Sequence, residues 1–134
     1  MKQLYDIMIK GGENIRDKIT EYVMQAGWEE AVILGAVGSV EKLEFTAPVE
    51  NELPLRTGTT PCHGAAEILS FTGEIMKREK MDPALEAVYP DKSSPLFVHI
   101  HASCAIVGGH VCGGGLRGGR AFRALRVFIV PVEN

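Results

Sequence analysis

Histidine spacing gives this sequence its clearest chemical signal. In the segment LFVHIHAS (96–103), His99 and His101 are two residues apart, which places both side chains on one face of a strand. A third histidine, His110, follows in the glycine-rich stretch GGH. Three neutral imidazoles with an open fourth position are typical ligands of zinc or a similar divalent ion. We therefore predict a divalent-metal site made by these three histidines, with zinc as the expected ion.

Nearby residues are weaker candidates for the same site. His63, in the motif PCHG, is a candidate fourth ligand, and an ordinary loop position is the alternative. Glu67 and Glu74 flank the strand-like segment EILSFTGE, so each is a candidate for orienting a metal-bound histidine or for acting as a general base. The alternative for both carboxylates is an ordinary salt bridge. The alternative for the histidine pair is a structural role, with backbone and water as hydrogen-bond partners.

Glycines and arginines are concentrated after the third histidine. Five of the 15 glycines fall within residues 113–119, which predicts a tight turn or a nest of backbone N–H groups that binds an anion. Arg117 and Arg120 are the candidate side-chain contacts for such a small anionic ligand. The segment lacks the preceding strand and following helix of a dinucleotide-binding loop, so nucleotide binding is not indicated. Arg126 shares a strand face with two phenylalanines, which predicts a carboxylate partner at a buried edge or a subunit contact.

Length and composition bound the class of protein. A chain of 134 residues with 46% hydrophobic and 23% charged residues is typical of one globular domain. The formal net charge of -3 does not favour duplex DNA binding, which depends on neutralising phosphates. Three cysteines without a CxxC pair indicate reduced thiols in the core. No apolar run approaches the roughly 20 residues of a membrane span, and the N-terminus lacks signal-peptide features. We therefore expect a cytoplasmic protein with no membrane contact.

The elements that position these residues follow from hydrophobic periodicity. Apolar residues recur at helical spacing over residues 13–26, which predicts one principal helix. The run AVILGAV (31–37) predicts a strand buried on both faces. Proline-rich residues 47–64 predict a loop or an irregular edge, and residues 77–94 predict a surface excursion. The other predicted strands are 3–9, 39–46, 65–76, 97–104 and 121–132. Six strands that mostly follow one another without intervening helices predict an α+β fold in a single domain, with a mainly antiparallel sheet.

Three of these motifs together resemble a known family. The segments EILSFTGEI (67–75), HIHAS (99–103) and GGHVCGG (108–114) occur in that order, behind a GENIRDKI helix and a GAVGSV turn. In this combination the chain resembles the PPC (plants and prokaryotes conserved) domain over nearly its whole length. The resemblance implies a compact α+β domain with a barrel-like antiparallel sheet that associates as a homotrimer. It also implies that His99, His101 and His110 bind metal near the subunit boundary, although the CAIV link before GGH is shorter than the family's usual hairpin.

The same resemblance supplies a second interpretation. In plants such domains follow AT-hooks in nuclear DNA-associated proteins, and bacterial and archaeal members carry a provisional label as DNA-binding proteins. This chain has no RGRP-type AT-hook core. We therefore expect a homotrimer of uncharacterised molecular function, with a metal site that binds a small ligand or activates water, and with no catalysis assigned. The alternative is a DNA-associated or protein-assembly module in which the histidines are structural and the arginines around Gly118 contact phosphates.

Overall fold

Six strands and one α-helix make up residues 3–132, the part of the chain that the computed structural model describes. In chain order these elements are β1 (Tyr5–Lys10), α1 (Ile15–Ala26), β2 (Ala31–Pro48), β3 (Thr57–Pro61), β4 (Ala66–Lys77), β5 (Leu96–Ala105) and β6 (Val111–Pro131). Two single-turn 3₁₀ helices, Arg78–Lys80 and Pro83–Leu85, lie between β4 and β5. Within the described residues, no helix is long and apolar enough to cross a membrane.

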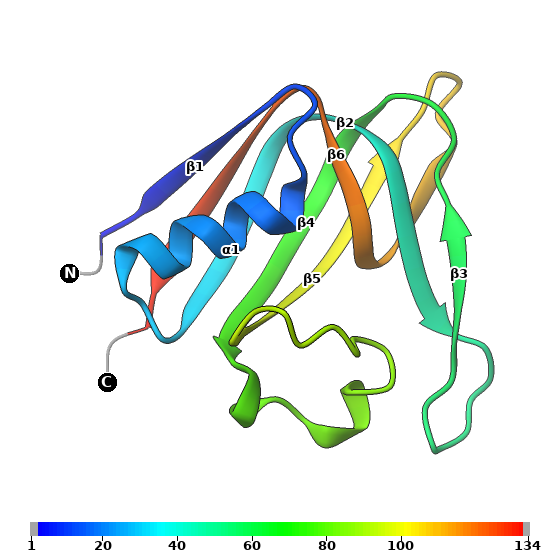
Figure 1. Ribbon diagram of the computed structural model, residues 1–134. Helices are drawn as coiled ribbons and strands as arrows, with labels where there is room; N and C mark the ends of the chain where they lie inside the picture. The colour runs from blue at the N-terminus through cyan, green and yellow to red at the C-terminus, as the bar shows by residue number, and fades with distance from the viewer. Residues whose placement is uncertain (1–2, 133–134) are drawn as a thin grey trace.

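The sheet closes on itself because β2 has hydrogen-bonded neighbours on both edges. β2 is antiparallel to β4 and to β6, and β5 is antiparallel to the same two strands. β2, β4, β5 and β6 therefore form a closed ring, which β1 extends beside β6 and β3 extends beside β2. Figure 1 shows the helix lying across one side of this ring. This arrangement confirms the predicted α+β fold with a mainly antiparallel sheet.

The helix begins and ends where its sequence provides caps. The side chain of Asn14 accepts a hydrogen bond from the backbone N–H of Asp17, and the left-handed residue Gly27 ends the helix, as is usual at both termini. One helix face carries Ile15, Ile19 and Val23, which are all fully buried in the main core. The predicted helix is confirmed, and it starts two residues later than predicted because Asn14 is its cap.

β2 is one long strand with a single buried face, which corrects two predictions. The segments 31–37 and 39–46 were expected to be separate strands, and the first was expected to be buried on both faces. In the structure they run continuously from Ala31 to Pro48, and Val32, Leu34 and Val37 are exposed. The physical reason is that one helix covers only one side of the ring, so the apolar side chains on the other side of β2 have no layer packed on them.

Two segments expected to be irregular are strands. Thr57–Pro61, within residues 47–64 that were predicted to be a loop or an irregular edge, pairs with Glu44–Pro48 of β2 as the edge strand β3. Pro61 of β3 and Pro48 of β2 are tolerated because they lie at the two ends of this edge ladder. The glycine-rich residues 113–119, expected to form a tight turn, lie inside β6 and pair with β2 and β5. Both segments take their extended form from partner strands, which local sequence preferences do not report.

Residues 77–94 are more than a surface excursion. Met81, Val88 and Tyr89 from this segment form a second buried cluster with Phe97 of β5. Leu85, Val88 and Tyr89 have helical i, i+3, i+4 spacing, and the backbone N–H groups of the latter two donate to the carbonyl of Leu85. This turn packs its apolar side against the ring and so places Tyr89 beside the end of β5.

The three thiols are free, as predicted. Cys62 and Cys104 are buried with their Sγ atoms 3.4 Å apart, and Cys112 is half-buried. Burial raises the pKa of the Cys62 and Cys104 thiols, so both favour the neutral, unreactive form.

We expect Gly38→Ala to destabilise the fold. Gly38 has a φ of 145°, and a Cβ there would lie 2.1 Å from the carbonyl oxygen of Ala124 on β6. Backbone strain and overlap together should cost about 2–4 kcal/mol of unfolding free energy, measured by denaturant titration. The matched control is Gly118→Ala, where no atom lies within 4 Å of the added Cβ, and it should lose much less. Equal losses in both variants would contradict the close approach of β2 to β6.

Candidate metal and ligand site

His99 and His101 share the outer face of β5, as their spacing predicts. Their ring centroids are 4.9 Å apart and the ring planes are nearly perpendicular. The alternate residues Val98, Ile100 and Ala102 are buried in the core. Because successive side chains of a strand point to opposite faces, burying one set directs the two imidazoles away from the core together.

A carboxylate on the neighbouring strand orients the ring of His99. The register pairs Glu74 of β4 with His99, and Oε1 of Glu74 lies 3.1 Å from Nδ1 of His99. An ionised carboxylate only accepts hydrogen bonds, so in the neutral ring the proton lies on Nδ1 and the lone pair of Nε2 is free. Phe97 stacks on the same imidazole with ring centroids 5.3 Å apart. This combination fixes both the tautomer and the direction of His99, as carboxylates do for metal-binding histidines.

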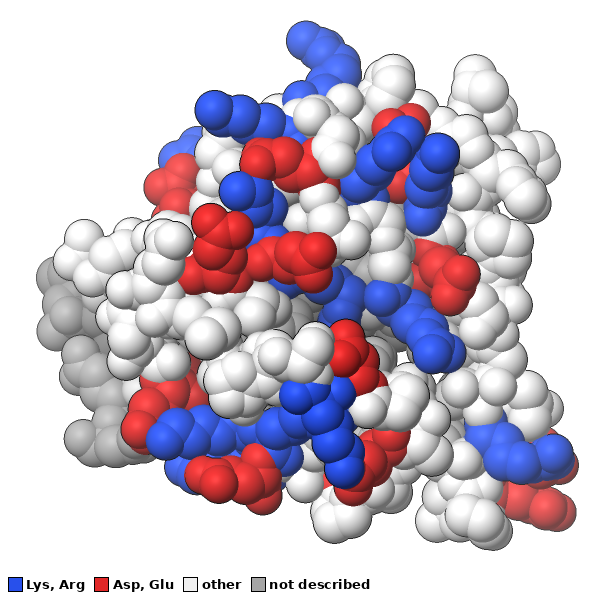
Figure 2. Space-filling view, viewed as in Figure 1, with Lys and Arg blue, Asp and Glu red and all other residues white. Residues whose placement is uncertain are grey.

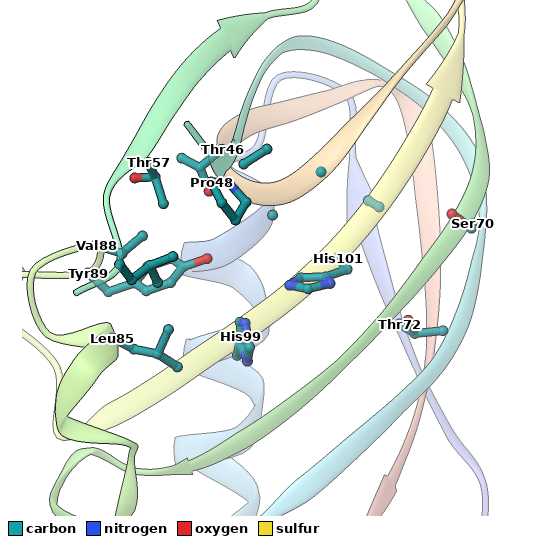
Figure 3. Close-up of a pocket in the computed structure, with 15 residues that line it drawn as sticks. Thr46, Pro48, Thr57, Ser70, Thr72, Leu85, Val88, Tyr89, His99 and His101 are labelled. Carbon is teal, nitrogen blue, oxygen red and sulfur yellow. The ribbon is translucent and has the colours of Figure 1, made fainter. Parts of the chain in front are cut away.

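A cavity of about 560 Å³ opens beside the histidine pair. This volume lies within the range of about 300–1,000 Å³ that is usual for small-molecule sites. Figure 3 shows Leu85, Val88 and Tyr89 on one side of the pair and Ser70 and Thr72 on the other. The lining residues are Thr46, Ala47, Pro48, Leu55, Thr57, Ser70, Thr72, Leu85, Val88, Tyr89, His99, His101, Ala102, Gly114 and Gly115. The cavity therefore combines five strands, β2 to β6, with the segment between β4 and β5.

The lining of this cavity is uncharged apart from any proton that the histidines take up. Among the described residues that line it there is no aspartate, glutamate, lysine or arginine. Hydroxyl groups and the two imidazoles supply the polar contacts, while Leu55, Leu85 and Val88 supply apolar ones. Such a lining suits a ligand with an apolar body and few hydrogen-bonding groups. A charged group on that ligand would need a bound cation to compensate its burial.

The β6 position that faces His101 has no side chain. The register pairs His101 with Gly115, and Gly115 in turn with Thr46 of β2. A Cβ on Gly115 would lie 2.9 Å from Oγ1 of Thr46 and 3.3 Å from the phenolic oxygen of Tyr89. Glycine at this position therefore leaves room for the Tyr89 hydroxyl, and β6 supplies no third ligand opposite His101.

His110 lies away from the histidine pair of its own chain. Its carbonyl accepts a hydrogen bond from the N–H of Ile106, the residue after the end of β5. Ile106 is five residues from His101, or about 16 Å at about 3.3 Å per residue. The short hairpin places His110 at its exposed tip. Within residues 3–132, no three His, Cys, Asp or Glu side chains lie together as ligands of one metal ion would. One chain thus does not assemble the three-histidine site, and His110 as a ligand stays a prediction that requires a neighbouring copy.

The other predicted candidates for this site are placed elsewhere. Glu67 pairs with Ala105 near the hairpin end of β5, so the carboxylate beside the histidines is Glu74 and not Glu67. His63 is exposed after β3 and does not line the cavity. Glu67 does not approach the pair, because β4 and β5 lie side by side in a register that brings only the Glu74 end of β4 to His99.

Two of the four arginines near the glycine-rich stretch, Arg120 and Arg126, have carboxylate partners. Nε of Arg120 lies 2.8 Å from Glu41, and Nε of Arg126 lies 2.8 Å from Asp6. The partner predicted for Arg126 is confirmed, although this ion pair is exposed and not at a buried edge. Arg117 lines a separate, smaller cavity. Figure 2 shows acidic and basic side chains interspersed over this face of the molecule, with no extended basic surface.

The cavity wall that Leu85, Val88 and Tyr89 provide was not predicted from the sequence. Proline content led to the prediction that their segment is a surface excursion, yet the i, i+3, i+4 spacing of these three apolar residues was a usable signal. Thr46 and Thr57 were also missed, because nothing local in the sequence shows that the ends of β2 and β3 lie beside β5.

The residues present fit part of the ligand set of a divalent metal. Ring centroids 4.9 Å apart allow one ion to contact both imidazoles, since a zinc–nitrogen bond is about 2.0–2.1 Å long. Glu74 supports His99 from behind. The remaining positions are free for water, for a donor atom of a ligand or for a side chain of a neighbouring copy.

An antiparallel ring of strands with one helix defines an α+β class of domain. The profile of the Plants and Prokaryotes Conserved (PCC) domain, the domain abbreviated PPC above, matches residues 2–133. The chain therefore belongs to this family, which confirms the resemblance found in its motifs. A search of curated proteins gave no match.

Solved structures share this fold at low sequence identity. A plant- and prokaryote-conserved protein from Pyrococcus horikoshii is 22% identical with a TM-score of 0.77, over 98% of this chain and 80% of that chain. A metal-containing protein from Archaeoglobus fulgidus is 23% identical with a TM-score of 0.76, over 98% and 81%. A "Putative DNA-binding protein" from Ralstonia eutropha is 13% identical with a TM-score of 0.72, over 97% and 78%. These similarities show a common fold.

We expect Gly115→Ala to destabilise the protein by about 1–3 kcal/mol, because the added methyl group overlaps Thr46 and crowds Tyr89. Combining it with Thr46→Ala removes the nearer obstacle, so the two losses should not add and the double variant should recover part of the stability. Denaturant unfolding of the four proteins in this cycle measures the coupling. Strictly additive losses would show that Gly115 does not make room for its neighbours in the cavity.

Proposed function

We propose that this protein binds a small, partly apolar ligand through a divalent metal, zinc, held by His99 and His101 at the cavity between β5 and the segment 78–95. The observation that carries the proposal is the pair of adjacent imidazoles, one of them oriented by Glu74, at the wall of a cavity large enough for a small molecule. The metal-containing relative of the same fold adds support.

The bound ion would supply the charge that the cavity lacks. Zinc acts as a Lewis acid and attracts an anionic or electron-rich group of a ligand. His99 and His101 would hold it, while Thr46, Thr57 and Tyr89 offer hydroxyl groups to the remainder of the ligand. The proposed ligand is therefore a small molecule with an apolar body and one metal-binding group, such as a carboxylate. No reaction is assigned to the site.

The outer face of β2 supports assembly of several copies, which we propose to be a homotrimer. Val32, Leu34 and Val37 are 38%, 57% and 68% exposed on this one strand. Val32 and Leu34 line a groove together with the two histidines. A contiguous apolar surface of this kind is typical of an interaction site. Because this surface adjoins the two histidines, an interface there would put the metal site next to the subunit boundary, where a neighbouring copy can supply further ligands.

Zinc binding tests the proposed metal site. Titrating the metal-free protein should show binding and a raised melting temperature, because an ion at a hundred times its Kd adds about 2.7 kcal/mol to stability. The double variant His99→Ala/His101→Ala should lose both effects, whereas the control His63→Ala should keep them, since its exposed loop histidine is remote from the cavity. Unchanged zinc stoichiometry by elemental analysis in the double variant would remove the proposed site.

Light scattering tests the assembly. The native protein should have three times the mass of one chain, and Leu34→Glu should dissociate it, because a carboxylate cannot be buried in an apolar interface without a partner. Met24→Glu is the matched control, since Met24 is 51% exposed on α1, which is not part of the proposed interface. A monomeric native protein, or a Leu34→Glu variant of unchanged mass, would contradict the trimer on this surface.

DNA association is the alternative function, and the relatives named as DNA-binding proteins give it its support. The geometry of this chain supports it less well. Arg120 and Arg126, two of the arginines around Gly118, are occupied by carboxylates, so phosphate contacts would have to break existing ion pairs. The formal net charge of -3 opposes the same interaction.

A further inference from the structure

A second cavity of about 240 Å³ lies behind Tyr89, and three arginines line it. Tyr89 and Val88 line both this cavity and the larger one beside the histidines. The arginines come from distant parts of the chain: Arg16 from the first turn of α1, Arg78 from the residue after β4 and Arg117 from β6. The volume is below the range of about 300–1,000 Å³ usual for small-molecule sites, so the cavity suits a small ion or a single ligand group.

Arg16 holds a positive charge in a desolvated position. Its side chain is half-buried, and Nη1 donates a hydrogen bond to the carbonyl of Leu116 at 3.1 Å. The guanidinium lies over the ring of Tyr89, 5.4 Å from the centroid. Desolvation by burial lowers the pKa of Arg16, and the charges of Asp17 and Asp91 offset only part of this effect.

Arg78 carries a buried donor without an acceptor. Its Nη2 donates to the carbonyl of Tyr89, which fixes the guanidinium against the segment that it borders. Its Nε is buried and has no hydrogen-bond partner within the described part of the chain. An unsatisfied buried donor is costly, and an acceptor oxygen from a ligand would satisfy it.

None of these three arginines has a carboxylate at salt-bridge distance among residues 3–132, although Arg56, Arg120 and Arg126 each have one. Asp17 and Asp91 also line the cavity and reduce its formal charge to +1. Both are exposed, and Asp91 accepts a hydrogen bond from the N–H of Ser93. The carboxylates therefore lie toward solvent, whereas the half-buried charges of the cavity are the positive ones of Arg16 and Arg78.

We propose that Arg16, Arg78 and Arg117 form an anion-binding site for inorganic phosphate or the phosphate group of a small monoester. Guanidinium groups match the oxygens of phosphate with paired N–H donors, and three of them converge here without competing ion pairs. The hydroxyl groups of Ser93 and Ser94 line the same cavity and add donors. This site is separate from the proposed metal site and does not depend on it.

Calorimetric titration of the full-length protein with inorganic phosphate tests the site, in the presence of a metal chelator and at constant ionic strength. The native protein should bind phosphate more tightly than acetate. Arg117→Gln should weaken phosphate binding by about fivefold to tenfold, the effect of losing one partly exposed charge-assisted hydrogen bond. Arg117 is exposed, so this variant should fold normally. Arg16→Gln should weaken binding further.

Two controls separate this proposal from its alternatives. Arg123→Gln removes the same charge from an exposed β6 arginine that does not line the cavity, and it should bind phosphate like the native protein. His99→Ala/His101→Ala should also retain phosphate binding, whether or not zinc binding is lost. The proposal is overturned if phosphate does not bind, if Arg117→Gln matches Arg123→Gln, or if the histidine variant loses phosphate. Binding of a duplex oligonucleotide in preference to phosphate, lost in Arg117→Gln, would overturn it as well.

Discussion

The hydrogen-bond register between β5 and β6 is the constraint on which the candidate site depends. It pairs His101 with Gly115 and Cys104 with Cys112, and the short turn beyond Ala105 follows directly from it. This register puts a residue without a side chain opposite the histidine pair and puts His110 at the far tip of the hairpin. This pairing leaves a space beside the imidazoles. A different register would place another side chain there. The cavity is thus a consequence of strand pairing as much as of residue type.

Tyr89 connects the two cavities that carry the functional proposals. Its ring packs against Phe97 with centroids 5.3 Å apart, its hydroxyl lies near Gly115, and the guanidinium of Arg16 lies over its ring. One aromatic side chain therefore forms a wall of an uncharged cavity and of a cationic one. The segment 78–95, held by its own buried cluster, positions this wall. The two sites consequently select different chemistry from the same region of the molecule.

Much of the fold could be predicted because the signals are local. The helix has an apolar stripe and a capping asparagine, and β5 alternates between core residues and histidines, so each carries its structure in its own residues. The antiparallel character of the sheet followed from strands that succeed one another without helices. The strands β3 and the glycine-rich half of β6 were not predicted, because their extended conformation depends on pairing with β2.

The sequence by itself determined that the imidazoles of His99 and His101 lie on the same face of β5. It also determined that the chain is a single α+β domain and that it resembles the family to which it belongs. Only the tertiary structure decided what surrounds those imidazoles. Glu74 rather than Glu67 reaches His99, Gly115 rather than His110 faces His101, and Tyr89 closes the wall. Side-chain alternation within a strand is a local property of the backbone, whereas contacts between strands depend on register and loop packing that no single segment encodes.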